Sequence, residues 1–123
     1  MKFIKLMALA LLTGSVLLVT APAHAFAIYN ESDQEVCISK WYSVVNCYAK
    51  IAPHSKFSGE KGAGLKNVWA GRSGKDTCYC SSKFSIPEAG SAKVHGRVIK
   101  IYDRHEKQVG EVSIDQVGCA DLK

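Results

Sequence analysis

The stretch that decides the fold class is residues 92–115, AKVHGRVIKIYDRHEKQVGEVSID. It contains two runs rich in β-branched residues, 92–103 and 109–115, separated by the charged residues RHEKQ. Two such runs joined by a short polar turn are typical of antiparallel strand pairs. The sequence therefore predicts a β-hairpin near the C-terminus.

The first of these runs changes its apolar phase part of the way along. Val94 and Val98 share one face of an extended chain, whereas Ile99 and Ile101 share the other. A strand buried on both faces would show this pattern, and so would a β-bulge near Val98 that shifts the register by one residue. We predict one strand over 92–103, with either of these two explanations for the change.

A bulge at that position would turn a basic set of side chains outward, namely Lys93, His95, Arg97, Lys100 and Tyr102. This face is a candidate binding site for a polyanion, such as a glycan sulfate, a lipid headgroup or an acidic protein. Glu111 and Asp115 alternate with apolar residues across the hairpin, so we expect acidic side chains beside the basic ones. A solvated face with matched charges is the preferred interpretation, because exposed ion pairs are common and contribute little.

The rest of the chain repeats the pattern of short apolar runs between turn residues. Five further strands are predicted, over 26–29, 36–45, 47–52, 67–71 and 77–86. No window outside the first 25 residues has helical spacing of apolar positions. We therefore predict an all-β fold, a small antiparallel β-sandwich or barrel of about seven short strands.

Glycine-rich segments separate several of these strands. Gly59, Gly62 and Gly64 lie close together and predict a loop over 54–66. The loops 53–67 and 70–76 are, with the basic run, the places where we first expect function.

Residues 1–25 have the features of an export signal. Two lysines precede an apolar run over 6–19, and an A-x-A site ends at Ala25. Cleavage after Ala25 would leave a single domain, 26–123, in the periplasm or outside the cell. The apolar run is shorter than the roughly 20 residues that a membrane span needs, so we predict a cleaved signal rather than a retained anchor. No second long apolar run follows it, so we expect no transmembrane segment in the mature chain.

The charge of the chain is only mildly basic. Without Lys2 and Lys5, the Lys plus Arg count falls from 16 to 14 against 11 acidic residues, a net charge of +3. Such a balance slightly favours acidic partners, but it lacks the dense basic stripe of a nucleic-acid binder. We expect no nucleic-acid partner and no cofactor.

All five cysteines lie in the predicted mature chain: Cys37, Cys47, Cys78, Cys80 and Cys119. An exported chain meets an oxidising compartment, so structural disulfides are expected, and an odd count leaves one cysteine free. Cys78 and Cys80 face the same side of a strand and are too cramped to bond each other. We favour Cys37–Cys47, which requires a wide loop between them, and Cys119 with Cys78 or Cys80.

Metal binding and catalysis have weaker signals. His54, His95 and His105 show no metal-ligand spacing with the cysteines, so we predict no metal site. The sequence has no C-x-x-C and no G-x-S-x-G motif. We expect no enzyme, and a thiol-dependent activity of the unpaired cysteine is kept as an alternative.

Aromatic residues form a second candidate surface. Trp41, Tyr42 and Trp69 can form an exposed binding surface, although at least one Trp in a domain this small is commonly core. The preferred function is binding of another protein or a surface glycan by an exported domain. The alternative is a membrane-active β-sandwich in which these rings enter lipid headgroups while Lys and Arg hold anionic lipid.

The segments FAIYNESDQEVCI (26–38) and IAPHSKFS (51–58) resemble the starts of several secreted β-sandwich families, thaumatin-like and aegerolysin-like among them. The resemblance covers about two strands and includes no diagnostic motif. No residue role is transferred from it, and it assigns no family.

Overall fold

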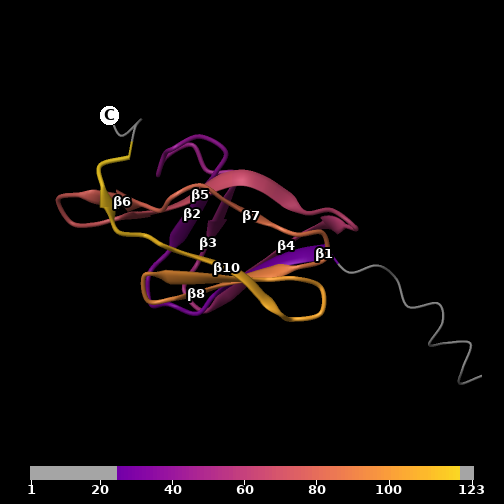
Figure 1. Ribbon diagram of the computed structural model, residues 1–123. Helices are drawn as coiled ribbons and strands as arrows, with labels where there is room; N and C mark the ends of the chain where they lie inside the picture. Colours follow the sequence, from indigo (N-terminus) through magenta and orange to yellow (C-terminus); the bar gives the residue numbers. More distant parts are fainter. Residues whose placement is uncertain (1–24, 120–123) are drawn as a thin grey trace, which may run out of the picture.

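The structure is a computed structural model that describes residues 25–119, apart from the side chain of Lys61. The signal segment was predicted over 1–25; residues 1–24 lie outside the described residues, and the segment stays a prediction. The described chain contains eleven strands and no helix, and the strands form two sheets. Figure 1 shows the sheets as two layers, so the predicted all-β class is confirmed.

The first sheet is the lower layer in Figure 1 and has the order β10-β9-β8-β1-β4. Its strands are β1 (Ala25–Asn30), β4 (Ser55–Lys61), β8 (Ser91–His95), β9 (Val98–Tyr102) and β10 (Gln108–Ser113). β1 pairs with β8 in parallel, and the other pairs in this sheet are antiparallel. We predicted antiparallel pairing throughout, and the parallel pair of β1 and β8 is the exception.

The second sheet has the order β11-β6-β5-β2-β3, with β7 paired to β5 beside this path. Its strands are β2 (Val36–Ser39), β3 (Ala49–Ile51), β5 (Leu65–Ser73), β6 (Cys78–Cys80), β7 (Phe84–Ile86) and β11 (Gln116–Val117). All of these pairs are antiparallel.

One core lies between the layers. Both sheets contribute fully buried aliphatic side chains to it, including Ile28, Ile38, Val68, Val94 and Ile99. Alternation along each strand sends the neighbouring side chains outward. The core therefore fixes which residues each outer face presents.

The predicted strand over 92–103 is wrong in one respect, because the chain reverses inside it. β8 and β9 form a hairpin in which Val94 lies opposite Ile99. Gly96 has φ 64° and is the first of the two turn residues, as in type II′ hairpin turns. Residues that lie opposite each other in a hairpin share a face of the sheet, so the turn explains why the apolar residues change phase along 92–103. The predicted bulge near Val98 is therefore not needed.

The predicted loop over 54–66 is also wrong, because it contains β4 and the start of β5. The register of β1 with β4 shifts between Ala25 and Ala27, which places Gly59 beside Phe26. A Cβ at position 59 would lie 1.8 Å from the Phe26 ring. This glycine permits close packing in a strand, so it does not mark a flexible segment.

Other boundaries differ by a few residues. The strand predicted over 36–45 ends at Ser39, and the run 77–86 divides into β6 and β7. β5 continues to Ser73, so the predicted loop 70–76 is half strand. The described residues form eleven strands instead of the predicted seven, because the runs 77–86 and 92–103 each form two strands and because β4 and β11 were not predicted.

The predicted disulfides are confirmed. Cys37 bonds Cys47 and Cys80 bonds Cys119, with Cα–Cα distances of 5.3 and 5.7 Å, and Cys78 is free. The wide loop that the first bridge requires is present, because β2 ends at Ser39 and β3 begins at Ala49.

A buried arginine joins the two sheets at one end of the core. The Arg72 guanidinium donates through Nη1 to the Gly96 carbonyl at 3.0 Å and through Nη2 to Ser32 Oγ at 2.8 Å. Its Nε is buried without a hydrogen-bond partner among the described residues. Burial, and then the charge of Arg97, lower the pKa of Arg72, but an arginine stays protonated.

Candidate functional site

A row of lysine and tyrosine side chains crosses the outer face of the first sheet. Tyr29 on β1 lies opposite Lys56 on β4 and opposite Lys93 on β8, and Lys93 lies opposite Lys100 on β9. These side chains point outward because their strand neighbours fill the core. With Tyr102 at the end of β9, these residues are called the Tyr-Lys face below.

Two of the three ammonium groups of this face, those of Lys56 and Lys93, lie over its rings. Lys56 Nζ is 5.7 Å from the centre of the Tyr29 ring, and Lys93 Nζ lies 6.0 Å from Tyr29 and 5.3 Å from Tyr102. Contacts of this kind contribute about 0.5–1 kcal/mol each at exposed sites. Lys93 is thus held between two tyrosines at the centre of the face.

The positive charges here have no close acidic partner. Among the described residues, the ion pairs within 4.0 Å are His54–Asp33 and His95–Glu31, and neither includes a lysine. Lys93 and Lys100 stand directly opposite each other, and like charges in that position repel.

The acidic residues expected to balance this face do so only in part. Glu111 lies opposite Lys100 in register, as the sequence predicted, but at more than ion-pair distance. Asp115 follows the end of β10 and does not lie in the row. The predicted matching of charges is therefore found in register but not as ion pairs.

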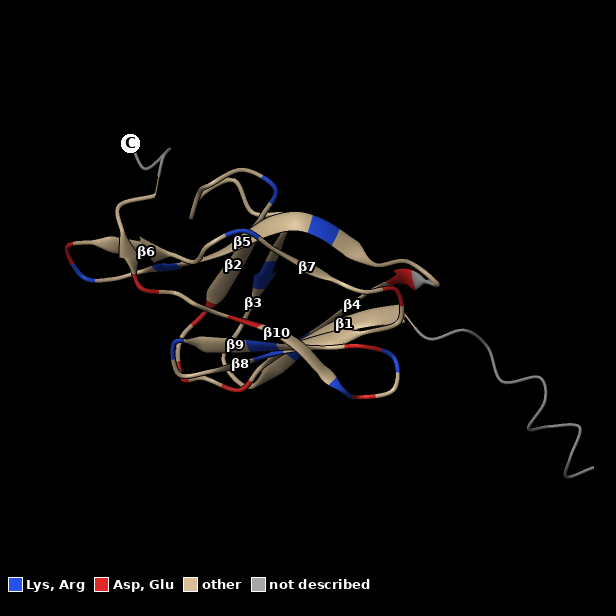
Figure 2. Cartoon of the chain, viewed as in Figure 1, with Lys and Arg blue, Asp and Glu red and all other residues tan. Residues whose placement is uncertain are grey.

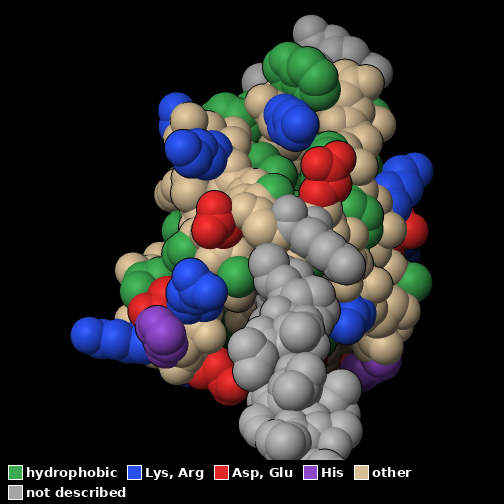
Figure 3. Space-filling view, turned by 90° about the vertical axis from the view of Figure 1, so that its right-hand side faces the viewer, with side chains coloured by type: hydrophobic (Ala, Val, Ile, Leu, Met, Phe, Trp, Pro, Cys, Tyr) green, Lys and Arg blue, Asp and Glu red, His purple; other side chains and the backbone are tan. Residues whose placement is uncertain are grey.

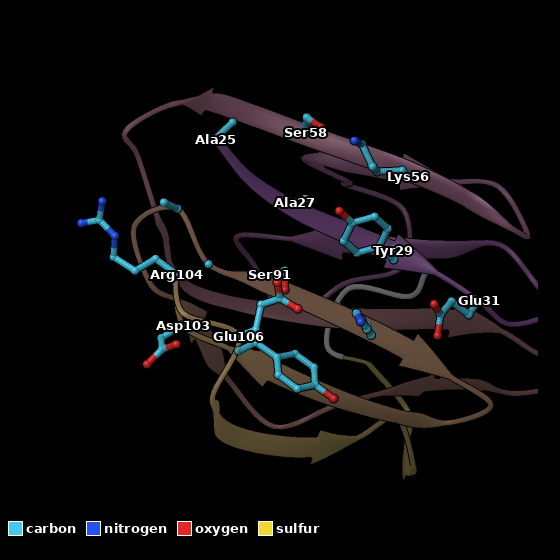
Figure 4. Close-up of a pocket in the computed structure, with 14 residues that line it drawn as sticks. Ala25, Ala27, Tyr29, Glu31, Lys56, Ser58, Ser91, Asp103, Arg104 and Glu106 are labelled. Carbon is cyan, nitrogen blue, oxygen red and sulfur yellow. The ribbon is translucent and has the colours of Figure 1, made fainter. Parts of the chain in front are cut away.

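An open hollow of about 570 Å³ lies over this face (Figure 4). Tyr29 and Lys56 project side by side along its length, Glu31 stands at one end, and Arg104 and Glu106 stand at the other. A second hollow of about 510 Å³ shares Glu31, Lys93 and Tyr102 with the first and continues past His95, Lys100 and Glu111. Together they form a long shallow depression across the sheet.

The turn at the far end of the depression is ordered by a carboxylate. Asp103 Oδ1 accepts the backbone N–H of Lys107 at 2.9 Å and that of His105 at 2.8 Å. The Lys107 N–H chiefly, and the His105 N–H as well, lower the pKa of Asp103 against a smaller opposing effect of desolvation. The charged turn that follows β9 thus keeps a fixed shape.

The basic residues singled out from the sequence do not all meet. Lys93, Lys100 and His95 line the depression. Arg97 lies in the β8–β9 turn and covers the ring of Tyr79, 4.8 Å from its centre. Sequence reasoning missed Tyr29 and Lys56, since one was a strand residue without a known neighbour and the other lay in a predicted loop.

The aromatic candidates lie on the second sheet. The rings of Tyr42 and Trp69 meet edge to face at 6.1 Å, and Trp41 is 64% exposed. The loop that contains Trp41 and Tyr42 arches over the upper layer in Figure 1. These residues therefore form a surface separate from the Tyr-Lys face.

The free thiol of Cys78 is half-buried on β6. A catalytic thiol needs a base such as a histidine within hydrogen-bond distance. Two of the three histidines in the described residues lie beside carboxylates, with His54 Nε2 at 2.8 Å from Asp33 and His95 Nδ1 at 3.9 Å from Glu31. Within the described residues, no cluster of three or more His, Cys, Asp or Glu side chains has the arrangement of a metal site. A thiol-dependent activity stays an untested alternative.

Comparison with protein-family models, with curated proteins and with solved structures gives no match. Within residues 25–119, no helix has the length and apolar character needed to cross a membrane.

Proposed function

We propose that this chain is an exported binding domain and that its Tyr-Lys face holds an acidic glycan. The observation that supports this most directly is the row of Lys56, Lys93 and Lys100, which lies under an open depression and has no carboxylate within ion-pair distance. Repulsion between opposed ammonium groups is relieved when an anion lies between them.

The shape and chemistry of the depression suit an extended sugar. Sulfate or carboxylate groups of the glycan would accept charge-assisted hydrogen bonds from the lysines. The rings of Tyr29 and Tyr102 offer apolar faces beside these charges. The two joined hollows, of about 570 and 510 Å³, each have the volume of a small-ligand site and together accommodate a chain of several sugar units.

The proposal is tested by titrating the oxidised mature protein with a sulfated oligosaccharide and with the same oligosaccharide after desulfation. We expect Lys93→Gln to weaken binding of the sulfated ligand about tenfold, or about 1.4 kcal/mol, since it removes one charge-assisted hydrogen bond. Lys66→Gln, at an exposed position on β5 of the other sheet, is the matched control and should bind normally.

Equal weakening by both substitutions would mean that the ligand senses only net charge, and the proposed site would be wrong. Binding of the desulfated ligand with unchanged affinity would show that the sulfate groups do not contribute to binding, and the proposed recognition of an acidic glycan would be wrong.

A further inference from the structure

The loop between β2 and β3, residues 40–48, exposes an unusual share of the protein's apolar surface. Five large hydrophobic side chains are exposed in the described residues, and three of them belong to this loop. They are Trp41, Val45 and Tyr48, with 64%, 56% and 39% of their surface exposed. The segment is called the aromatic loop below.

The exposure does not result from a loosely held loop. The Cys37–Cys47 bridge closes its base, and Ser43 Oγ accepts the backbone N–H of Val45 at 2.9 Å. Val44, only 8% exposed, packs beneath the loop against the Cys80–Cys119 bridge. The loop is thus fixed before it meets a partner, which reduces the entropy lost on binding.

Positive charges stand beside these aromatic rings. Lys40 Nζ lies 4.6 Å from the centre of the Tyr48 ring, and Lys83 Nζ lies 5.6 Å from that of Trp69. Trp69 is also the ring that Tyr42 meets edge to face. Aromatic and cationic groups are therefore interleaved around the loop.

Carboxylates are scarce near this surface. Between Val36 and Lys75 the sequence has one acidic residue, Glu60, which lies on β4 in the other sheet. Figure 2 shows blue segments on the upper layer, on β3, on β5 and in the aromatic loop, with the red segments of that layer at its turns. Figure 3 shows a hydrophobic side chain projecting at the top of the molecule beside a Lys or Arg side chain.

We propose that the aromatic loop docks on an anionic lipid surface, with Trp41 and Val45 entering the headgroup region and Lys40 and Lys83 facing lipid phosphates. Indole rings suit this boundary because they have an apolar body and a polar N–H. The charges of Lys40 in the loop and of Lys83 beside Trp69 complement an anionic surface, and the loop contains no carboxylate that would oppose them. The Tyr-Lys face lies on the outer side of the opposite layer, so a docked protein would still present it.

The test uses the oxidised mature protein with phosphatidylcholine vesicles, with and without about one third phosphatidylglycerol. We expect co-sedimentation and a blue shift of tryptophan fluorescence only with the anionic vesicles. Trp41→Ser should weaken this binding about tenfold or more. Val109→Ser, which removes a side chain 52% exposed on β10, is the matched control and should leave it unchanged.

Lys40→Gln should weaken binding to the anionic vesicles about fivefold, the factor expected for one lysine near an anionic surface. Lys93→Gln should bind vesicles normally, and Trp41→Ser should still bind the sulfated oligosaccharide, so this proposal and the proposed function fail independently. The circular dichroism spectrum of each variant checks its fold, and Val45→Ser replaces Trp41→Ser if that variant misfolds.

Three results would overturn the proposal. The first is absence of binding to anionic vesicles, and the second is equal binding to neutral ones. The third is concentration-dependent dimerisation that Trp41→Ser abolishes without any vesicle binding, which would make a second copy of this chain the partner.

Discussion

Replacing Gly59 by alanine should destabilise the protein strongly, although the sequence alone places this residue in a loop. The new Cβ would lie 1.8, 2.2 and 2.5 Å from three atoms of the Phe26 ring. That ring is 2% exposed and packs in the core, so it has little room to withdraw. Inserting a methyl group into such packing costs about 2 kcal/mol, within the usual range for overpacked cores.

A loss of that size should lower the midpoint of thermal unfolding by about 10 °C for a domain of this length. Differential scanning calorimetry and urea titration of the oxidised mature protein measure it. Gly110→Ala is the matched control, because that glycine lies on strand β10, where a new Cβ would make an ordinary 3.4 Å contact with Ile101. Its effect should stay within about 0.5 kcal/mol.

The double variant Gly59→Ala with Phe26→Leu checks the mechanism. A smaller side chain at position 26 makes room for the new methyl group, so the two substitutions together should cost less than the sum of their separate effects. If Gly59→Ala is as stable as Gly110→Ala, then residues 54–66 form the flexible loop that the glycines suggested, and the described packing of β1 against β4 is wrong.

Three further predictions concern the sulfurs and the pH dependence. Native alkylation followed by mass spectrometry should label Cys78 alone, and a label on Cys80 or Cys119 would contradict the pairing. Replacing Cys37 and Cys47 together by alanine should lower the free energy of unfolding by roughly 2–3 kcal/mol, because the bridge no longer restricts a loop of 10 residues in the unfolded chain. Urea titration measures this loss, and an unchanged urea midpoint would contradict it. Because its folded-state pKa is lowered, Asp103 contributes stability above its ordinary pKa of about 3.9, and that contribution is lost as the pH falls through the lower folded value. Asp103→Asn should therefore flatten the fall in urea midpoint between about pH 5 and pH 2, and an identical pH profile in both proteins would refute the stabilising role of the Lys107 and His105 N–H groups.

Several properties follow from local sequence. The all-β class follows from β-branched runs without helical spacing, since strand periodicity is a property of neighbouring residues. The pairing of Cys37 with Cys47 was favoured but not fixed by the sequence, because five cysteines allow many two-bridge connectivities and this pair requires a wide loop. The odd number of cysteines fixes one free thiol, although not which one.

Other properties depend on residues that are distant in the sequence. Gly59 permits a strand because Phe26 packs against it, and Gly96 turns a hairpin where an unbroken strand was predicted. The parallel pairing of β1 with β8 places Tyr29 beside Lys93, far along the chain.

The sequence by itself thus determined the class of fold and the presence of one free cysteine, and it favoured one of the two disulfide pairs. Only the tertiary structure decided which basic and aromatic side chains share a face. Strand order and register bring together Tyr29, Lys56 and Lys93 and separate Arg97 from them, and each of these depends on how the buried faces pack across the whole domain.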